Sequence, residues 1–417
     1  MKGAILTPIA YVSRWGALRV LLPIVIVFEA TGLLQRDQAW RGDLVWTLDW
    51  PPVTFVALGP LVAGCAAVDA ARLGRGVEHF ATRPISRSPG FAVWIAYVVG
   101  VGATHLIFMV VALGISLPKG FDFWAPLALV NQVLVLALFA SLGVAIGKVA
   151  PPVLGGLVAA MISFIAVYLW SYPSQHLMPL NLGVRTTPAI GREYNPAYLL
   201  PQALILLTLS LGFLLPQVVA KGIIHRRVVA SGAIVLPLVL SFTIVAPRLK
   251  DAMEVPDHCG SVSGVPVCYY AEHARVEHVY NDALFVLFEQ ARNAGYGELV
   301  PARVEEMSFN RAGSSMDSRI GNLQIGIEAL EEHGVDLRHV ALSLTEPVHC
   351  AQLKGDVPPS MTYATDLGEL VDTWTEVALP GSWEANGHSD APLSATVAQQ
   401  RMKEFRTCTY AHFLSDR

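Results

Sequence analysis

Charged side chains are scarce in this sequence. Only 15% of its 417 residues are Asp, Glu, Lys or Arg, whereas 53% are hydrophobic, and the mean hydropathy is +0.48. Soluble domains carry about 25% charged residues, so this chain has too little polar surface to cover a water-soluble fold. The same composition excludes a disordered chain, a collagen and a small disulfide-rich scaffold. We therefore expect a membrane protein.

Signatures of several enzyme classes are also missing. The chain has no G-x4-G-K-[ST] phosphate loop, no H-E-x-x-H zinc motif and no G-x-S-x-G nucleophile elbow. The nearest approach to a phosphate loop, Gly143-x3-Gly147-Lys148, is too short and lies in an apolar run, so it predicts close helix packing. We expect no catalytic site, cofactor or metal in this chain. His349 and Cys350 are the alternative metal ligands, unless Cys350 forms a disulfide.

Long apolar stretches dominate the first 246 residues. A helix that crosses a bilayer needs about 20 apolar residues, and seven stretches meet this requirement, which predicts an α-helical polytopic membrane domain. The predicted spans are Gly16–Leu34, Val53–Ala71, Phe91–Leu117, Ala125–Val149, Val153–Ser171, Tyr198–Ala220 and Val228–Val245.

The distribution of charge predicts the orientation. With the N-terminus in the cytoplasm, the inner loops receive eleven Lys and Arg residues and the outer loops five, as the positive-inside rule favours. Seven spans then place residues 247–417 outside a bacterial plasma membrane. Residues 1–246 carry a charge of +8 and residues 247–417 a charge of −12, which argues against nucleic acid as a partner. Trp40, Trp46, Trp50 and Trp124 fall at the outer boundary, as expected of an interfacial belt.

Cysteine usage agrees with this orientation. Cys65 lies within the second span, and the other four cysteines lie in the C-terminal domain. An even set in one domain indicates disulfides and an oxidising compartment. Of the three connectivities we favour Cys259 with Cys268, which flank a Gly-rich turn, and Cys350 with Cys408. Free buried thiols are the alternative.

Ionisable and amide side chains within the spans are functional candidates, because burying them in lipid is costly. Glu29 lies in the first span, His105 in the third and Asn131 in the fourth. We expect Glu29 to face a solvated cavity or a neighbouring helix, with a proton relay as the alternative. His105 and Asn131 are expected to join helices. Asp69, near the cytoplasmic end of the second span, is expected to reach water.

The connection between the second and third spans, about residues 72–90, predicts a short charged helix that ends before Pro84. Such a helix followed by a Pro-x-Ser-Arg turn resembles the coupling segment of ABC-2-type exporter membrane subunits. The matching residues are Arg75, Gly76, Glu78, Arg83, Pro84, Ile85, Ser86 and Arg87.

The resemblance covers about residues 1–225, and the alternative is an ordinary positively charged loop. It implies that Arg75, Glu78, Arg83, Pro84 and Arg87 dock on a separate cytoplasmic ATPase, which would hold ATP and Mg²⁺. The chain would assemble as a homodimer or with a sister subunit in the lipid bilayer. A seventh span and a C-terminal domain depart from the simplest pattern of the family.

The C-terminal domain is predicted to be mainly helical, with an α+β arrangement as the alternative. Apolar periodicity predicts helices at Ala271–Ala294, Met316–His333, Thr365–Val377 and Ala395–Thr407, and a strand at Val340–Leu344. The first functional hypothesis is a transporter subunit. The others are a membrane-anchored sensor or scaffold, and an enzyme whose function lies in the C-terminal domain.

Overall fold

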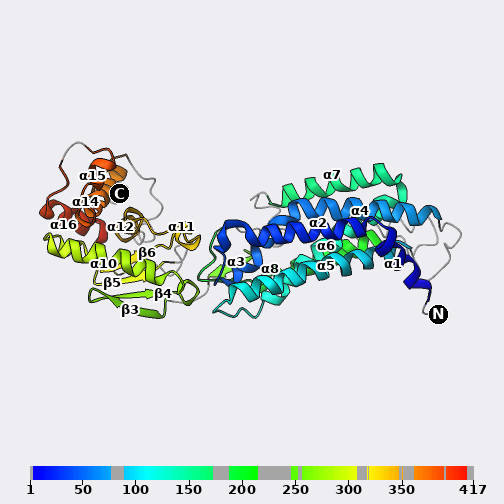
Figure 1. Cartoon of the computed structure of the whole chain (residues 1–417), viewed down its shortest axis with the longest axis horizontal. Helices are drawn as coiled ribbons and strands as arrows, with labels where there is room; N and C mark the ends of the chain where they lie inside the picture. The colour runs from blue at the N-terminus through cyan, green and yellow to red at the C-terminus, as the bar shows by residue number, and fades with distance from the viewer. Residues whose placement is uncertain are drawn as a thin grey trace.

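A computed structural model of the chain shows two bodies joined end to end, a long helical bundle and a smaller C-terminal domain (Figure 1). The structure describes residues 3–76, 89–171, 187–214, 246–251, 256–307, 317, 319–346, 350, 361–388 and 391–410. The fold is mostly helical. The N-terminus lies at the free end of the bundle, far from the C-terminal domain (Figure 1).

The bundle consists of helices that follow the predicted apolar stretches closely. They are α1 (Gly3–Trp15), α2 (Leu18–Leu34), α3 (Leu44–Asp49), α4 (Phe55–Gly76), α5 (Pro89–Ser116), α6 (Ala125–Val149), α7 (Pro152–Ser171) and α8 (Pro196–Leu214). Within the described residues, four helices are long and apolar enough to cross a membrane, or five if the pair α1 and α2, bent by 65°, forms one span. The end of the sixth predicted stretch and the seventh, 228–245, lie outside the described residues.

Glycines allow the central helix α4 to touch its neighbours. A Cβ atom added at Gly143 or Gly147 of α6 would lie 2.2 Å from the carbonyl oxygen of Ala63 or Ala67 in α4. On the other side of α4, a Cβ atom at Gly64 would lie 3.1 Å from a carbonyl oxygen of α7. The prediction that Gly143 and Gly147 serve helix packing is confirmed.

The C-terminal domain combines a four-stranded sheet with helices on one of its faces (Figure 1). The strands are β3 (His258–Val262), β4 (Val265–Tyr269), β5 (Arg303–Glu306) and β6 (Ile320–Leu323), in this order, with β3 antiparallel to β4 and the other pairs parallel. The helices are α10 (Glu277–Asn293), α11 (Ile327–Leu330), α12 (Leu337–Thr345), α14 (Met361–Ala378), α15 (Ser382–Ala385) and α16 (Ala395–Arg406). Short 3-10 turns occur at Gln35–Gln38, Pro51–Thr54, Ala271–His273 and Gly297–Leu299.

Two of the predicted elements are wrong. The strand predicted at Val340–Leu344 is part of helix α12, which Asp336 caps by accepting a hydrogen bond from the Arg338 amide. Short apolar runs do not distinguish a strand from a buried helix. The helix predicted at Met316–His333 is instead strand β6 followed by the single turn α11, because pairing with β5 decides its conformation. The other three predicted helices correspond to α10, α14 and α16.

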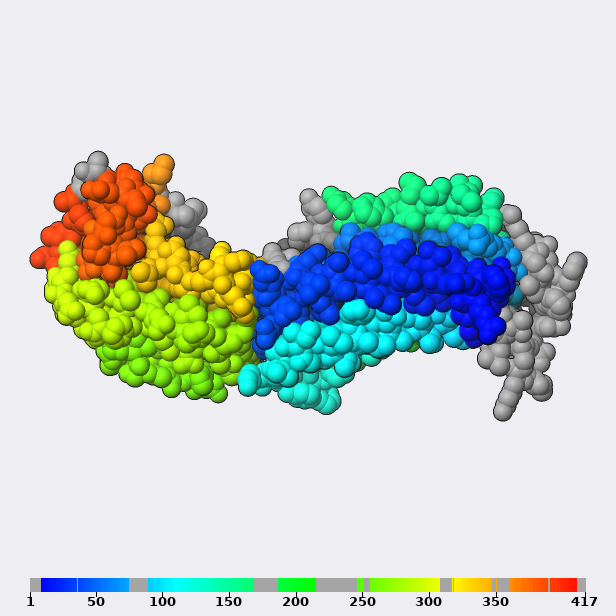
Figure 2. All heavy atoms as spheres, viewed as in Figure 1, coloured from blue at the N-terminus to red at the C-terminus, as the bar shows by residue number. Residues whose placement is uncertain are grey.

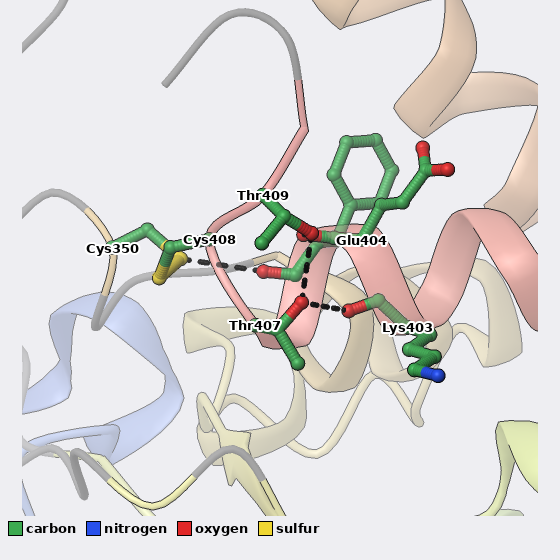
Figure 3. Close-up of a disulfide and its surroundings, with 7 residues drawn as sticks. Cys350, Lys403, Glu404, Thr407, Cys408 and Thr409 are labelled. Atoms are coloured by element: carbon green, nitrogen blue, oxygen red, sulfur yellow. Dashed lines mark hydrogen bonds between the residues drawn. A yellow bond between two sulfur atoms is a disulfide. The ribbon is translucent and has the colours of Figure 1, made fainter. Parts of the chain in front are cut away.

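Both favoured cysteine pairs lie at disulfide distance. Cys259 and Cys268 face each other across β3 and β4. Cys350 joins Cys408, which lies two residues after the end of α16 (Figure 3). Cys65, in α4, is the free cysteine among the described residues.

A second, two-stranded sheet lies where the bundle meets the C-terminal domain. Strand β1 (Arg192–Tyr194) precedes α8, and β2 (Leu249–Asp251) pairs with it in antiparallel fashion. This sheet ties the chain that enters the C-terminal domain to the end of the bundle.

Candidate functional site: a polar network inside the bundle

The three predicted intramembrane polar residues are all buried, and two of them meet. Glu29 on α2 is 1% exposed and His105 on α5 is fully buried, and Glu29 Oε1 lies 2.9 Å from His105 Nδ1. Asn131 is also buried but belongs to a neighbouring set of contacts. Glu29 therefore faces a neighbouring helix, as expected.

A chain of hydrogen bonds continues from His105 to α3. His105 Nε2 lies 3.0 Å from Oε1 of Gln132 on α6, and Gln132 Nε2 donates to the Leu48 carbonyl at 2.8 Å. The ring of Phe55 forms an apolar wall, its centroid 4.9 Å from that of the imidazole. Four helices, α2, α5, α6 and α3, are thus joined through one imidazole.

Asn131 joins α6 to α8. Its Nδ2 donates to Gln202 Oε1 at 2.8 Å and to the Leu199 carbonyl at 3.1 Å. Gln202 is buried and donates to the Tyr198 hydroxyl. Asn131 thus joins two helices, as expected; an interhelical hydrogen bond of this kind contributes about 0.6 kcal/mol in membrane proteins.

A buried ion pair completes the network at the end of the bundle. Asp49, the last residue of α3, accepts hydrogen bonds from Arg248 Nη2 at 2.7 Å and from the Tyr194 hydroxyl at 2.8 Å. Burial opposes the charge on Arg248, but the Asp49 carboxylate outweighs it and raises the pKa of Arg248. Burial, reinforced by the charge of Asp49, raises the pKa of Tyr194. Both groups therefore keep their protons at neutral pH.

The contacts of His105, of Asn131 and of Asp49 lie next to one another in the bundle. Asn131 and Gln132 are neighbours on α6, and Leu48 and Asp49 are neighbours on α3. Arg248 Nη1 also lies 3.5 Å from Gln202 Oε1, which connects the contacts of Asp49 to those of Asn131. We call Glu29, His105, Gln132, Asn131, Gln202, Asp49, Arg248 and Tyr194 the polar network.

Sequence reasoning missed five members of this network. Gln132 and Gln202 lie in apolar windows and could have been found by the rule that identified Asn131. Asp49, Tyr194 and Arg248 are separated by up to 199 positions, so no local pattern brings them together.

Asp69 does not reach water, and that expectation is wrong. Its carboxylate is fully buried on α4 and accepts hydrogen bonds from the amide of Ala17 at 2.8 Å and from the hydroxyl of Tyr97 at 2.8 Å. A third, longer bond comes from the amide of Leu18. Asp69 thus caps α2 from a different helix, because the bend after α1 leaves the first amides of α2 without partners.

The tryptophans predicted to form an interfacial belt are also placed differently. Trp40, Trp46 and Trp50 are buried in one continuous hydrophobic core with Tyr269 and Tyr280 of the C-terminal domain, and Trp124 is partly buried against the bundle. The C-terminal domain rests directly on this end of the bundle (Figure 2). Tertiary packing therefore covers rings that the sequence places at a membrane boundary.

Hydrogen bonds of Arg275 also join the C-terminal domain to the end of the bundle. Arg275 Nη2 donates to the carbonyls of Ala39 and Leu330, both at 3.0 Å. Nearby in the sequence, His273 Nδ1 lies 2.5 Å from Glu306 Oε1, and both side chains are buried. Burial disfavours the imidazolium, but the Glu306 carboxylate outweighs it and raises the pKa of His273 above its usual 6.5.

Most of the predicted coupling segment lies outside the described residues, including Glu78, Arg83, Pro84 and Arg87. Arg75 lies in the last turn of α4. His349 is likewise outside them, and Cys350 is held in its disulfide. Among the residues that the structure describes, no group of three or more His, Cys, Asp or Glu is arranged to hold a metal ion.

The geometry above is the basis for any functional assignment. No protein family, no curated protein and no solved structure matches the chain.

Proposed function

We propose that the chain is the membrane-spanning subunit of an ATP-driven transporter similar to ABC-2-type exporter subunits, working with a separate cytoplasmic ATPase. The observation that carries this proposal is where α4 ends and α5 begins. α4 ends and α5 begins on the side of α1, since Asp69 of α4 bonds to Ala17, just after α1, and to Tyr97 in the first part of α5, and α1 lies at the end of the bundle opposite the C-terminal domain (Figure 1). A coupling segment between α4 and α5 would reach a cytoplasmic partner, while the C-terminal domain faces the other side.

The contacts of Asp69 support a mechanical role for this end. Asp69 belongs to α4, seven residues before Gly76, and its carboxylate holds the bend between α1 and α2. A force applied just after α4 would therefore pass to α2 through the hydrogen bonds of the Asp69 carboxylate. Transmission of this kind is what a coupling segment requires.

The proposed topology has seven spans in a bacterial plasma membrane, the N-terminus in the cytoplasm and the C-terminal domain outside. Its support is the excess of basic residues in the inner loops and the two cysteine pairs, since disulfides persist in oxidising compartments. The outward side of α7 exposes large apolar residues such as Leu154, Leu157 and Phe164. This surface suits lipid or the membrane helices of a second subunit.

Purification from the native host in mild detergent tests the proposal. We expect an ATPase in stoichiometric amount, whose hydrolysis is stimulated by the chain. The double variant Glu78→Ala with Arg83→Ala should abolish stimulation while the protein remains folded. The matched control, Glu193→Ala with Lys250→Ala, removes a half-exposed ion pair between β1 and β2, next to the C-terminal domain, and should leave stimulation unchanged. Unchanged stimulation in the Glu78 and Arg83 variant would count against the coupling segment.

A sensor or assembly scaffold is the second candidate. The continuous hydrophobic core between Trp46 and Tyr280 favours it, because a ligand bound by the C-terminal domain could shift the ends of α2 and α3 through this packing. This candidate predicts a folded preparation without a tightly bound ATPase and without transport.

A further inference from the structure

The hydrogen-bond pattern around His105 fixes which of its nitrogens carries a hydrogen. The Leu48 carbonyl can only accept a hydrogen bond, so the amide nitrogen of Gln132, at 2.8 Å, must face it. The amide oxygen of Gln132 then faces His105 Nε2 at 3.0 Å. Because that oxygen can only accept, Nε2 must carry a hydrogen.

This assignment leaves one proton to place between His105 and Glu29. Nδ1 of a neutral imidazole with Nε2–H has a lone pair and no hydrogen. A carboxylate oxygen has only lone pairs as well, so a 2.9 Å contact between Glu29 Oε1 and Nδ1 requires a proton between them. The pair holds this proton either as carboxylic acid and neutral imidazole, or as carboxylate and imidazolium.

The surroundings of Glu29 decide between the two forms. Its second oxygen, Oε2, is buried and has no hydrogen-bond partner among the residues that the structure describes. A carboxylate would leave half of its negative charge on this bare oxygen, at a cost of several kcal/mol in a medium of low polarity. The carbonyl oxygen of a neutral acid carries far less charge. The network's other carboxylate, Asp49, differs because Arg248 and Tyr194 bind it.

We infer that Glu29 and His105 form a proton-binding site inside the bundle, in which Glu29 is a neutral carboxylic acid that donates from Oε1 to Nδ1 of a neutral His105. The ligand is a single proton. Its release would leave a carboxylate on Glu29 beside the lone pair of Nδ1, a charge of −1 with no other donor on it among the described residues. Groups on α2, α5, α6 and α3 hold the site, so loss of the proton would loosen four helices together.

This inference does not depend on the proposed transporter function. It concerns the protonation of one buried pair, and it stands or falls on spectroscopy of the purified full-length chain with no ATPase present.

The test is infrared spectroscopy of the wild-type chain and of Glu29→Gln. In this variant the Gln amide nitrogen can donate to Nδ1, so the helix contacts are retained. We expect the wild type to show a protonated carboxyl C=O band at about pH 7, where exposed carboxyl groups are ionised. The band should disappear in Glu29→Gln.

Two controls assign the band. Glu193, a half-exposed carboxylate paired with Lys250, is changed to Gln, which should lower the carboxylate absorption and leave the protonated band intact. Glu306, the other buried glutamate among the described residues, is tested with Glu306→Gln, which should also retain it.

If Glu29→Gln does not fold, ¹³C-labelled glutamate in the Glu306→Gln background decides the matter, because Glu29 is then the buried glutamate left among the described residues to account for a shifted band. A wild-type spectrum without a protonated glutamate band, or a band lost only in Glu306→Gln, would overturn the inference.

Discussion

The two disulfides offer a quantitative prediction, because they close loops of very different length. Cys350 and Cys408 are 58 positions apart, and Cys259 and Cys268 are 9 apart. A cross-link stabilises a fold mainly by reducing the entropy of the unfolded chain, and more so for longer loops. Removing the long loop's cross-link should cost about 4.2 kcal/mol and the short loop's about 2.6 kcal/mol, a difference of about 1.6 kcal/mol.

Hydrogen exchange of the full-length chain in detergent measures this difference. The amides of α14, which packs on α10 in the domain core, report the opening of the C-terminal domain separately from the bundle. We expect Cys350→Ser with Cys408→Ser to lower the opening free energy of α14 more than Cys259→Ser with Cys268→Ser.

The free cysteine of α4 supplies the matched control, since Cys65→Ser leaves both cross-links intact and should leave α14 unchanged. Equal losses in the two double variants, or a larger loss for the short loop, would refute the reasoning from loop length.

Three further predictions concern packing, capping and protonation. Gly143→Val should destabilise the bundle by at least about 2 kcal/mol in thermal unfolding, since its Cβ would meet a carbonyl at 2.2 Å; Gly114→Ala, where nothing lies within 4 Å, should not. Asp69→Ala should cost about 2–4 kcal/mol, because three donors lose their acceptor, and an unchanged unfolding temperature would contradict this cap. The raised pKa of His273 means that its pairing with Glu306 stabilises the fold fully below about pH 6.5 and is lost as the pH rises through the folded pKa. A pH series of urea unfolding should show this decline, and His273→Gln should flatten it.

Part of the architecture follows directly from the sequence. Apolar length alone located the helices α2 and α4–α8, because a helix that is apolar all round needs no partner to be recognised. Spacing of small residues identified the contact of α6 with α4, since only glycine allows backbones to approach so closely. The cysteine pairs also followed, because their number and the turn at Gly260–Gly264 favour one connectivity.

Other features were decided by contacts between distant segments. The region around Ile320 has a helical pattern but becomes a strand, because a parallel neighbour, β5, satisfies its backbone there. Trp40, Trp46 and Trp50, at the end of the bundle next to the C-terminal domain, pack under that domain instead of lying exposed. Periodicity reports which side of a segment is apolar, but it carries no information on what covers that side.

The sequence by itself determined where the helices apolar enough to cross a membrane lie, and it picked out Glu29, His105 and Asn131 as polar groups within them. Only the tertiary structure decided that Glu29 meets His105, that Asn131 does not join them directly, and that Gln132 fixes the imidazole tautomer. The physical reason is that burial of a polar group follows from local composition, whereas its protonation depends on which donors and acceptors the other helices bring within hydrogen-bond distance.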